Sequence, residues 1–512
     1  MATRDATSGR RPPRKGLRRG SLTLVGSIAL GVASTAPSYS LAATLGFVVS
    51  EGAGHKAVAV VLVAFVPMYF IALAYRELNA AEPDCGTTFT WATRAFGPIL
   101  GWLGGWAILV ADIICMANLA QICGAYSFTV LRELGLANRL DDNLLWSTVA
   151  GVAWIVVMTY VCYRGLGVSK RVQYALLSVE ILTLVVFAVA ALVRVYSGAG
   201  VKGSSTPQWS WLWPGGLSMP VFAGSVLLAV FIYWGWDSAV STNEETEAPR
   251  TKPGRAAVIS TVLLLAIYGA VSTAAVAFAG VGSTGIGLGD PAHADDAFRA
   301  IGPVLFGDGP WGRVGMALLA ISVLTSAAAS TQTTILPTAR TALSMAVFRA
   351  LPSRFADIHP VHATPTWSTI GMGALSVAFY VGMTLVSERL LLALIGAIGL
   401  QIAFYYGLTG FACAWLFRRS ALRSPRLALT RLVMPLLGAL MLTVTFGYAV
   451  VSYAAQDYLT DTAGNVTIFG VGAVAVVGLG TLLLGLVPMA LQWWRGPEFF
   501  RGETLPRDEY AG

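Results

Sequence analysis

The sequence predicts an all-α integral membrane protein with twelve transmembrane helices. Hydrophobic residues make up 56% of the 512 residues and charged residues only 12%, whereas soluble domains usually carry about 25% charged residues. Apolar stretches recur along the chain at the length of about 20 residues that a helix needs to cross a bilayer. Lys and Arg also concentrate in alternate connections between these stretches, as they do in proteins that cross a membrane repeatedly.

Twelve apolar segments meet the length requirement, and connections rich in Gly, Pro and charged residues separate them. In chain order, the expected spans are 21–48, 57–78, 98–130, 146–163, 171–196, 219–243, 256–281, 312–346, 367–386, 389–416, 431–454 and 467–494. A basic tail, residues 1–20, precedes the first span, and residues 495–512 form a tail after the last. The first apolar run is too long for the apolar region of a signal peptide, so we expect no cleavage there.

Charge sets the expected orientation. If the N-terminus is cytoplasmic, every second connection and the C-terminus lie on the same side. Of the 34 Lys and Arg residues, 26 fall on that side and the other side holds only Lys56, Arg132, Arg139, Arg194, Lys202, Arg299, Arg313 and Arg389. Acids there include Asp141, Asp142, Asp290, Asp295, Asp296, Asp457 and Asp461. The positive-inside rule then predicts a multi-pass protein of the plasma (inner) membrane with both termini cytoplasmic. The net charge of +8 reflects this orientation, and we expect no nucleic-acid partner.

The sequence offers no motif for a metal, a nucleotide or covalent catalysis. The five cysteines are scattered without a CxxC pair, so we expect free, buried thiols at Cys85, Cys115, Cys123, Cys162 and Cys413. His359 and His362 stand among prolines without a carboxylate pattern, which indicates a turn. We find no P-loop and no nucleophile elbow, and we expect neither an enzyme nor a bound cofactor.

Two expected spans are interrupted near their middle. The first, 21–48, contains STAPSYS, in which Pro37 lacks an N–H and clashes with the preceding turn. The span 219–243 contains YWGWD, with Gly235 between two tryptophans. Each break alone is typical of a kink or of close helix packing. Together they begin two five-helix halves, 21–196 and 219–416, and paired breaks of this kind indicate a binding site. The segment 431–494 adds two further helices.

Three acids lie inside expected spans, where a charge costs about 2.5–3.5 kcal/mol on insertion scales and is a functional candidate. Gln173, Glu180 and Thr183 share one helix face, which we expect to face the bundle. Burial favours the neutral form of a carboxyl group, so Glu180 is our first candidate for proton exchange, with Asp112 second. Either acid could instead form a structural hydrogen bond. Asp237 is the best placed to contact a cationic ligand or to pair with an Arg.

Small hydroxyl residues mark the span 312–346. Ser322, Ser326 and Thr333 fall on one helix face among alanines. Such residues usually allow helices to pack closely. The alternative is a sodium site shared with the span 21–48.

Several segments resemble the amino acid–polyamine–organocation permease superfamily over about residues 20–420. They are LAATLGFVVSEGAG, YRELNAAEPDCGTTFTWATRAFGPILGWLGGW, FIYWGWDSAVSTNEETEAPRTKPGRAA and PTARTALSMAVFRALPSRFADIHPVHATPTWS. The resemblance implies a LeuT-like five-plus-five inverted repeat with discontinuous first and sixth spans, and it favours a proton over sodium as the coupling ion.

The resemblance also implies a substrate site at the two breaks. Backbone amides of Thr35, Ala36 and Ser38 would take a carboxylate at the positive end of the following half-helix. The other break would bind the amino group through carbonyls and cover it with aromatic rings, at Phe231, Tyr233, Trp234, Gly235 and Trp236. The first break departs from the glycine-rich family motif, because Ser34, Ala36 and Pro37 occupy positions where glycine or another small residue is expected. Pro37 removes one donor, and serine or threonine hydroxyls are the alternative donors.

We therefore expect a secondary active transporter that imports an amino acid or related amine by alternating access with a proton. The expected partners are a small-molecule substrate and the lipid bilayer. An amino acid or polyamine exchanger is the main alternative, and a non-transporting membrane sensor is a further one. Substrate identity and oligomeric state are not predicted.

Overall fold

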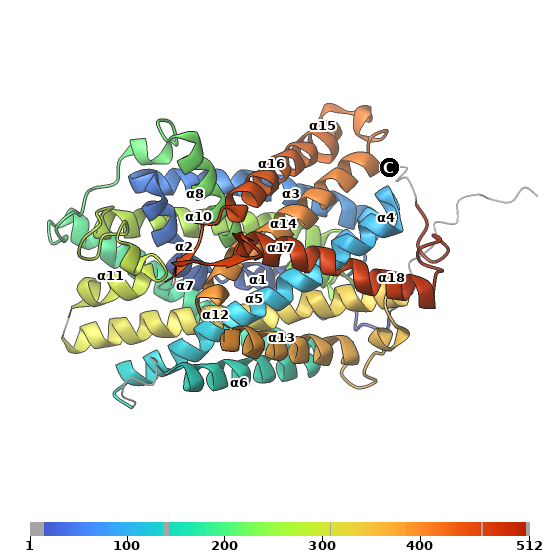
Figure 1. Ribbon diagram of the computed structural model, residues 1–512, viewed down its shortest axis with the longest axis horizontal. Helices are drawn as coiled ribbons and strands as arrows, with labels where there is room; N and C mark the ends of the chain where they lie inside the picture. The colour runs from blue at the N-terminus through green and yellow to red at the C-terminus, as the bar shows by residue number, and fades with distance from the viewer. Residues whose placement is uncertain (1–14, 137–142, 308, 387, 462–463, 508–512) are drawn as a thin grey trace, which may run out of the picture.

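Helices form almost the whole structure, and most of them lie along the long axis of the molecule (Figure 1). The computed structural model describes residues 15–507 apart from 137–142, 308, 387 and 462–463. Within these residues the only strands are four of two residues each. The predicted all-α membrane class is confirmed.

Most of the long α-helices begin and end close to the expected boundaries, but two shorter helices, of 9 and 10 residues, lie in segments where only connections were expected. The α-helices are α1 Leu24–Ser34, α2 Pro37–Val48, α3 Ala57–Ala81, α4 Thr88–Phe96, α5 Pro98–Glu133, α6 Leu144–Tyr163, α7 Leu166–Tyr196, α8 Met219–Ile232, α9 Ser238–Ser241, α10 Lys252–Ala279, α11 Ala297–Phe306, α12 Pro310–Val347, α13 Thr366–Val386, α14 Glu388–Leu416, α15 Pro425–Ala428, α16 Met434–Ala454, α17 Ala473–Leu484 and α18 Leu486–Arg495. Short 3-10 and π turns connect several of them.

Ten helical segments in the described chain are long and apolar enough to cross a membrane. The first, Leu24–Ala81, contains the first two expected spans in one continuous run. The sixth expected span is represented by α8, which is shorter and ends at the break. The ten segments, with α8 and α9, give twelve crossings if the first run crosses the membrane twice and if α8 and α9 together cross it once. The count of twelve and the inverted repeat stay predictions.

The expected start of the last span, at residue 467, is wrong. Residues 467–472 form a hairpin from β3 (Thr467–Ile468) and β4 (Val471–Gly472), and α17 begins only at Ala473. The turn residues Phe469 and Gly470 have φ of 53° and 77°. A two-residue hairpin turn needs such positive φ values, and the apolar Phe469 hid this turn in the sequence. A second hairpin pairs β1 (Thr460–Asp461) with β2 (Gly464–Asn465).

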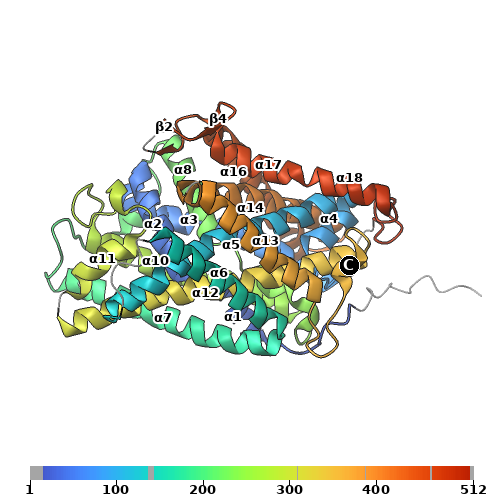
Figure 2. The same cartoon turned by 60° about the horizontal axis from the view of Figure 1, so that its bottom comes forward.

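The two longest helices, α5 and α12, run through the centre of the bundle and pack against each other. α5 also packs against α6, and there the close approach of the two backbones depends on glycine residues. A Cβ atom at Gly124 of α5 would lie 1.9 Å from the carbonyl oxygen of Ser147 in α6, and one at Gly151 would lie 2.4 Å from that of Ala120. Backbones of membrane helices approach this closely where glycine stands at the interface. In Figure 2, α17 and α18 run along the outside of the bundle.

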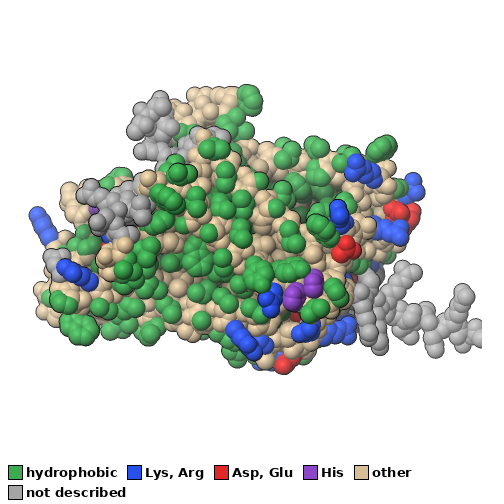
Figure 3. Space-filling view, turned by 90° about the horizontal axis from the view of Figure 1, so that it is seen from below, with side chains coloured by type: hydrophobic (Ala, Val, Ile, Leu, Met, Phe, Trp, Pro, Cys, Tyr) green, Lys and Arg blue, Asp and Glu red, His purple; other side chains and the backbone are tan. Residues whose placement is uncertain are grey.

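Charged side chains gather toward the two ends of the long axis, and the surface between them is mainly hydrophobic or uncharged (Figure 3). One end, which we call the N-terminal face, carries the described start of the chain. There Lys15 contacts Asp84 and Glu244, and Arg431 contacts Glu77. Lys15, Asp84 and Glu244 come from the N-terminal tail and from connections expected on one side of the membrane, and the structure places these three residues on one face. The other end is called the opposite face.

Some of the charges used to predict orientation cannot be placed. Arg139, Asp141, Asp142 and residues 1–14 lie outside the described residues, and the side chains of Arg389 and Asp461 are likewise outside the description.

Candidate functional site

The two predicted breaks are real and have different local causes. α1 ends at Ser34 because Ala36 takes a left-handed conformation, with φ 46° and ψ 64°, and Pro37 then starts α2. Proline disfavours the α-helical conformation of the residue before it, which places this turn before Pro37. α8 ends at Ile232, and Gly235 has φ 116°, a conformation that glycine adopts without a Cβ clash.

The breaks lie against each other in the centre of the molecule. A Cβ atom at Gly235 would lie 2.7 Å from the carbonyl oxygen of Ser34. α1 contacts α9 and α2 contacts α8, so the two broken helices run antiparallel. The residues expected at the site are thereby brought together. All of them are buried: Ser34, Thr35, Ala36, Ser38, Phe231, Tyr233, Trp234, Gly235, Trp236 and Asp237.

Side chains from neighbouring helices take up the carbonyl groups that the breaks release. The Ser330 hydroxyl on α12 donates to the Ser34 carbonyl at 2.9 Å, and the Ser40 hydroxyl donates to the Thr35 carbonyl at 2.6 Å. The Tyr268 hydroxyl on α10 donates to the Ile232 carbonyl at 2.6 Å. Such partners are what allow a helix to be interrupted inside a membrane.

The three amides expected to take a carboxylate have partners within the chain. The Thr35 and Ala36 N–H groups donate to the Val32 and Ala33 carbonyls at 3.2 Å each, which closes the last turn of α1. The Ser38 N–H, at the start of α2, donates to Oε1 of Glu180 at 2.8 Å. The protein's own carboxylate therefore lies at the helix end where the family resemblance expects that of a substrate.

Glu180 is joined there by hydroxyls of α12. Ser38 Oγ lies 2.6 Å from Ser322 Oγ, and the Tyr39 N–H donates to Ser326 Oγ at 3.1 Å. Thr333, the third residue of the predicted α12 face, instead donates to carbonyls of its own helix. The predicted face of α7 is correct, because Gln173, Glu180 and Thr183 are all buried. Oε2 of Glu180 has no hydrogen-bond partner in the described protein.

Asp237 binds two tyrosines. Tyr406 and Tyr405 of α14 donate to its two carboxylate oxygens at 2.9 and 3.3 Å. Tyr405 also accepts a hydrogen bond from the Trp234 indole, and Tyr406 stacks on Trp236 with 5.2 Å between ring centroids. Of the two alternatives for Asp237, the structure does not show the pairing with an Arg among the described residues, and contact with a cationic ligand stays a prediction. The tyrosine pair was missed, although two adjacent tyrosines inside an apolar span were a visible signal.

Asp112 lies apart from the Glu180 contacts. It is buried on α5 and accepts a hydrogen bond from the Thr338 hydroxyl of α12. A different residue of α5, Asn118, reaches the first break, since its amide oxygen accepts a hydrogen bond from Tyr39. This contact was not predicted, because a single amide in a long apolar helix is more often a packing contact than part of a site.

A comparison with known families adds a second line of evidence. Residues 22–477 match the family model described as amino acid permease. This chain belongs to the amino acid permease family. The predicted resemblance to the amino acid–polyamine–organocation superfamily is thereby confirmed.

Relatives of this permease are transporters of several substrates. The branched-chain amino acid permease BcaP of Lactococcus lactis is 25% identical over 49% of this chain and 54% of its own length. Cationic amino acid transporter 4 of Arabidopsis thaliana is 26% identical over 72% and 59%. The low-affinity putrescine importer PlaP of Escherichia coli K12 is 27% identical over 46% and 49%. The matched part spans about half the length of these curated relatives.

The segment before α1 packs into the N-terminal face of this permease. The Lys15 ammonium group is buried and lies 2.6 Å from Asp84, 2.8 Å from Glu244 and 3.1 Å from the Ser344 hydroxyl. Further along, the Ser21 N–H donates to the Glu245 carbonyl at 2.7 Å. This segment therefore contacts both α12 and the connection after α9.

Asp84, Cys85 and Glu244 would be close enough to share a metal ion, but the Lys15 ammonium group lies among them. Burial alone would raise the pKa of Asp84, but the charge of Lys15 and hydrogen bonds from Lys15 and Ser344 hold it below its ordinary value. A lowered carboxyl pKa stabilises the fold above the pKa of the unfolded chain, and that stabilisation is lost as the pH falls through the folded value.

The contact between the breaks predicts that Gly235→Ala destabilises the protein. An alanine there must hold a positive φ, at a cost of about 1–2 kcal/mol, and its Cβ would press on Ser34. Gly447→Ala on α16 is the matched control, since no atom lies within 4 Å of its added Cβ. We expect a lower Tm of the detergent-purified protein for Gly235→Ala only. Equal melting of the two variants would contradict the close contact.

The buried ion pair predicts that Lys15→Gln opens the N-terminal face. Removing one partner of a buried pair costs about 3–5 kcal/mol, so the segment should leave its place and expose Cys85, which lies 3.5 Å from the Lys15 ammonium group. Maleimide labelling followed by peptide mass spectrometry should show faster modification of Cys85 than in the wild type. Arg255→Gln, which removes an exposed cation, should leave the labelling unchanged. Unchanged labelling in Lys15→Gln would show that the segment stays in place without the ion pair.

Proposed function

We propose that this permease imports an amino acid or related amine across the plasma membrane by alternating access, coupled to protons. The observation that carries the proposal is the Glu180 carboxylate on the Ser38 amide, at the point where two antiparallel broken helices meet. Membership of the amino acid permease family supports the substrate class. The process consists of binding and release without a covalent step, so no catalytic residue is required.

The contacts of Glu180 supply a physical route to coupling. The N-terminus of α2 carries the positive end of a helix dipole and favours one negative charge. A substrate carboxylate arriving beside a charged Glu180 would meet repulsion of about 4 kcal/mol at 4 Å separation and an effective dielectric of 20. Protonation removes this repulsion and weakens the bond to the Ser38 N–H. Proton and substrate carboxylate therefore bind together, which is the condition for symport.

The second break would receive the amino group. Asp237 has two tyrosine donors but no cationic partner among the described residues, and it borders Gly235 and the aromatic rings of Trp234 and Trp236. An ammonium group placed there would gain a carboxylate and aromatic faces. Phe231 and Tyr233 complete the proposed cover, and the hydroxyls of Ser34, Thr35 and Ser38 complete the carboxylate side.

Asp237 also supports the alternative of an exchanger for cationic amino acids or polyamines. A diamine would use this carboxylate without needing the Ser38 amide, and Glu180 could then stay charged. Similarity to an arginine/ornithine antiporter of Latilactobacillus sakei, which is 24% identical over 48% of this chain and 50% of its own length, supports this alternative. Similarity to the putrescine importer supports only an amine as the substrate.

We further propose that the N-terminal face is cytoplasmic, since the positive-inside rule favours the side richer in Lys and Arg. The segment around Lys15 would then close the pathway on the cytoplasmic side.

Uptake into proteoliposomes tests the transport proposal. The panel contains branched-chain and cationic amino acids and putrescine, each with and without an inward proton gradient. We expect accumulation of at least one compound only when the gradient is present. Exchange without dependence on the gradient would favour the antiporter. Binding of a compound without any flux would contradict transport and favour a sensor.

The role of Glu180 is tested separately by Glu180→Gln. The amide side chain keeps the size and one acceptor oxygen but carries no titratable proton. We expect gradient-driven accumulation to fall to passive equilibration, while exchange of substrate across the membrane continues. Asp112→Asn is the matched comparison and should keep accumulation. The reverse result, with accumulation lost only in Asp112→Asn, would transfer the proton site to α5.

A further inference from the structure

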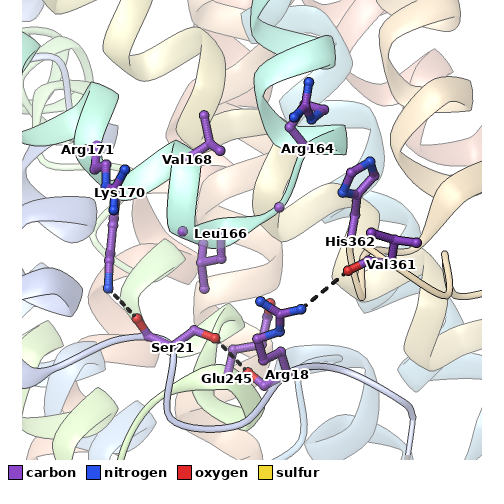
Figure 4. Close-up of a pocket in the computed structure, with 12 residues that line it drawn as sticks. Arg18, Ser21, Arg164, Leu166, Val168, Lys170, Arg171, Glu245, Val361 and His362 are labelled. Carbon is purple, nitrogen blue, oxygen red and sulfur yellow. Dashed lines mark hydrogen bonds between the residues drawn. The ribbon is translucent and has the colours of Figure 1, made fainter.

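A cavity of 410 Å³ opens at the N-terminal face, away from the two breaks. Its walls come from four parts of the chain that are distant in sequence: the start of α7, the segment before α1, the loop before α13 and Glu245 in the connection after α9 (Figure 4). Four cationic side chains line it, namely Arg18, Arg164, Lys170 and Arg171. Its volume lies within the usual range of small-molecule sites, about 300–1,000 Å³.

These cations differ from Lys15 in having no acidic partner among the described residues. Lys170 donates to the Ser21 carbonyl at 2.8 Å, Arg18 to the Val361 carbonyl at 3.3 Å and Arg164 to the Tyr160 hydroxyl at 2.7 Å. All three acceptors are neutral, so the positive charges are positioned without being neutralised.

The one acid in the lining does not offset these charges. Glu245 places its carboxylate 2.6 Å from Arg340, with both side chains almost fully buried. Loss of hydration, the neighbouring His359 ring and the positive charges of Arg164 and Arg18 lower the pKa of His362, which also lines the cavity. The cavity therefore has a positive potential that its own residues leave uncompensated.

The start of α7 adds to this potential. Gly165 precedes the helix with φ 102° and gives it no side-chain cap, and Gly165, Leu166 and Gly167 line the cavity. The first N–H groups of a helix have no acceptor within the helix and carry its positive dipole end. Here this end coincides with four cationic side chains in one cavity.

We propose that the cavity binds a phosphate-bearing anion, either the headgroup of an anionic phospholipid or free phosphate. Arg guanidinium groups bind phosphate oxygens in a bidentate fashion, and Lys supplies a compact charge. A phospholipid is within reach, because the exposed apolar side chains of Val168 and Tyr174 flank Lys170 and Arg171 on α7. The bound anion links α7 to the segment before α1 and to the loop before α13, which stabilises the closed N-terminal face.

The test compares the double variant Lys170→Gln/Arg171→Gln with Arg255→Gln/Arg495→Gln, a control that removes two exposed cations outside the cavity. Phosphatidylglycerol and phosphatidylcholine are titrated onto the detergent-purified full chain, and bound lipid is counted by native mass spectrometry. Inorganic phosphate is titrated separately at constant ionic strength against chloride, with Tm as readout. The single variant Arg164→Gln, which changes an exposed side chain, serves if the double variant does not fold.

We expect the wild type and the control to bind, and the cavity variants to bind at least about tenfold more weakly, as the loss of one charged hydrogen bond predicts. A response to phosphatidylglycerol alone identifies a lipid headgroup, and a response to phosphate as well identifies a site for the free anion. Equal weakening in cavity and control variants, or no binding of either probe by the wild type, would overturn the proposal.

Discussion

The polar backbone groups released at two helix breaks must find partners inside the protein, and the centre of the structure is arranged to supply them. Water and lipid offer no alternative at that depth, where an unpaired carbonyl or N–H group costs several kcal/mol. Ser330, Tyr268 and Glu180 meet this need from three different helices. The partners of the breaks therefore fix how α7, α10 and α12 pack around α1 and α2.

The same constraint makes these partners suited to a change of state. A backbone N–H or carbonyl group that bonds to a side chain, rather than to its own helix, can exchange that partner for another without unfolding the helix. The Ser38 amide is the clearest case, because its acceptor is a carboxylate whose charge depends on a proton. The other oxygen of that carboxylate, Oε2 of Glu180, is buried and has no hydrogen-bond partner among the described residues. The hydrogen bonds that stabilise the breaks are thus made by the same groups that the proposed substrate would contact.

Local chemistry made the breaks predictable, whereas their partners were not. Pro37 lacks an N–H and Gly235 permits a positive φ, and both properties are visible in a single sequence. The pairing of Asp237 with Tyr405 and Tyr406 depends on how α14 is rotated in the bundle, which periodicity alone does not fix. The hairpin at 467–472 was not predicted for a related reason. One of its two turn residues is Phe469, which adopts a positive φ although an apolar side chain is no turn signal in a sequence.

The cationic side chains at the N-terminal face are of two kinds, one buried and neutralised by acids and the other without an acidic partner among the described residues. Lys15 is fully buried, and its ammonium group is compensated by Asp84 and Glu244, so it acts as a structural bond whose loss leaves buried charge behind. Lys170 and Arg171 have no acidic partner in the part of the chain that the structure describes, so their charge remains available to an outside anion. Both groups bear on the segment that runs from Lys15 to Ser21. A closed state of this face therefore depends on an internal ion pair at one end of that segment and responds to an anion at the other.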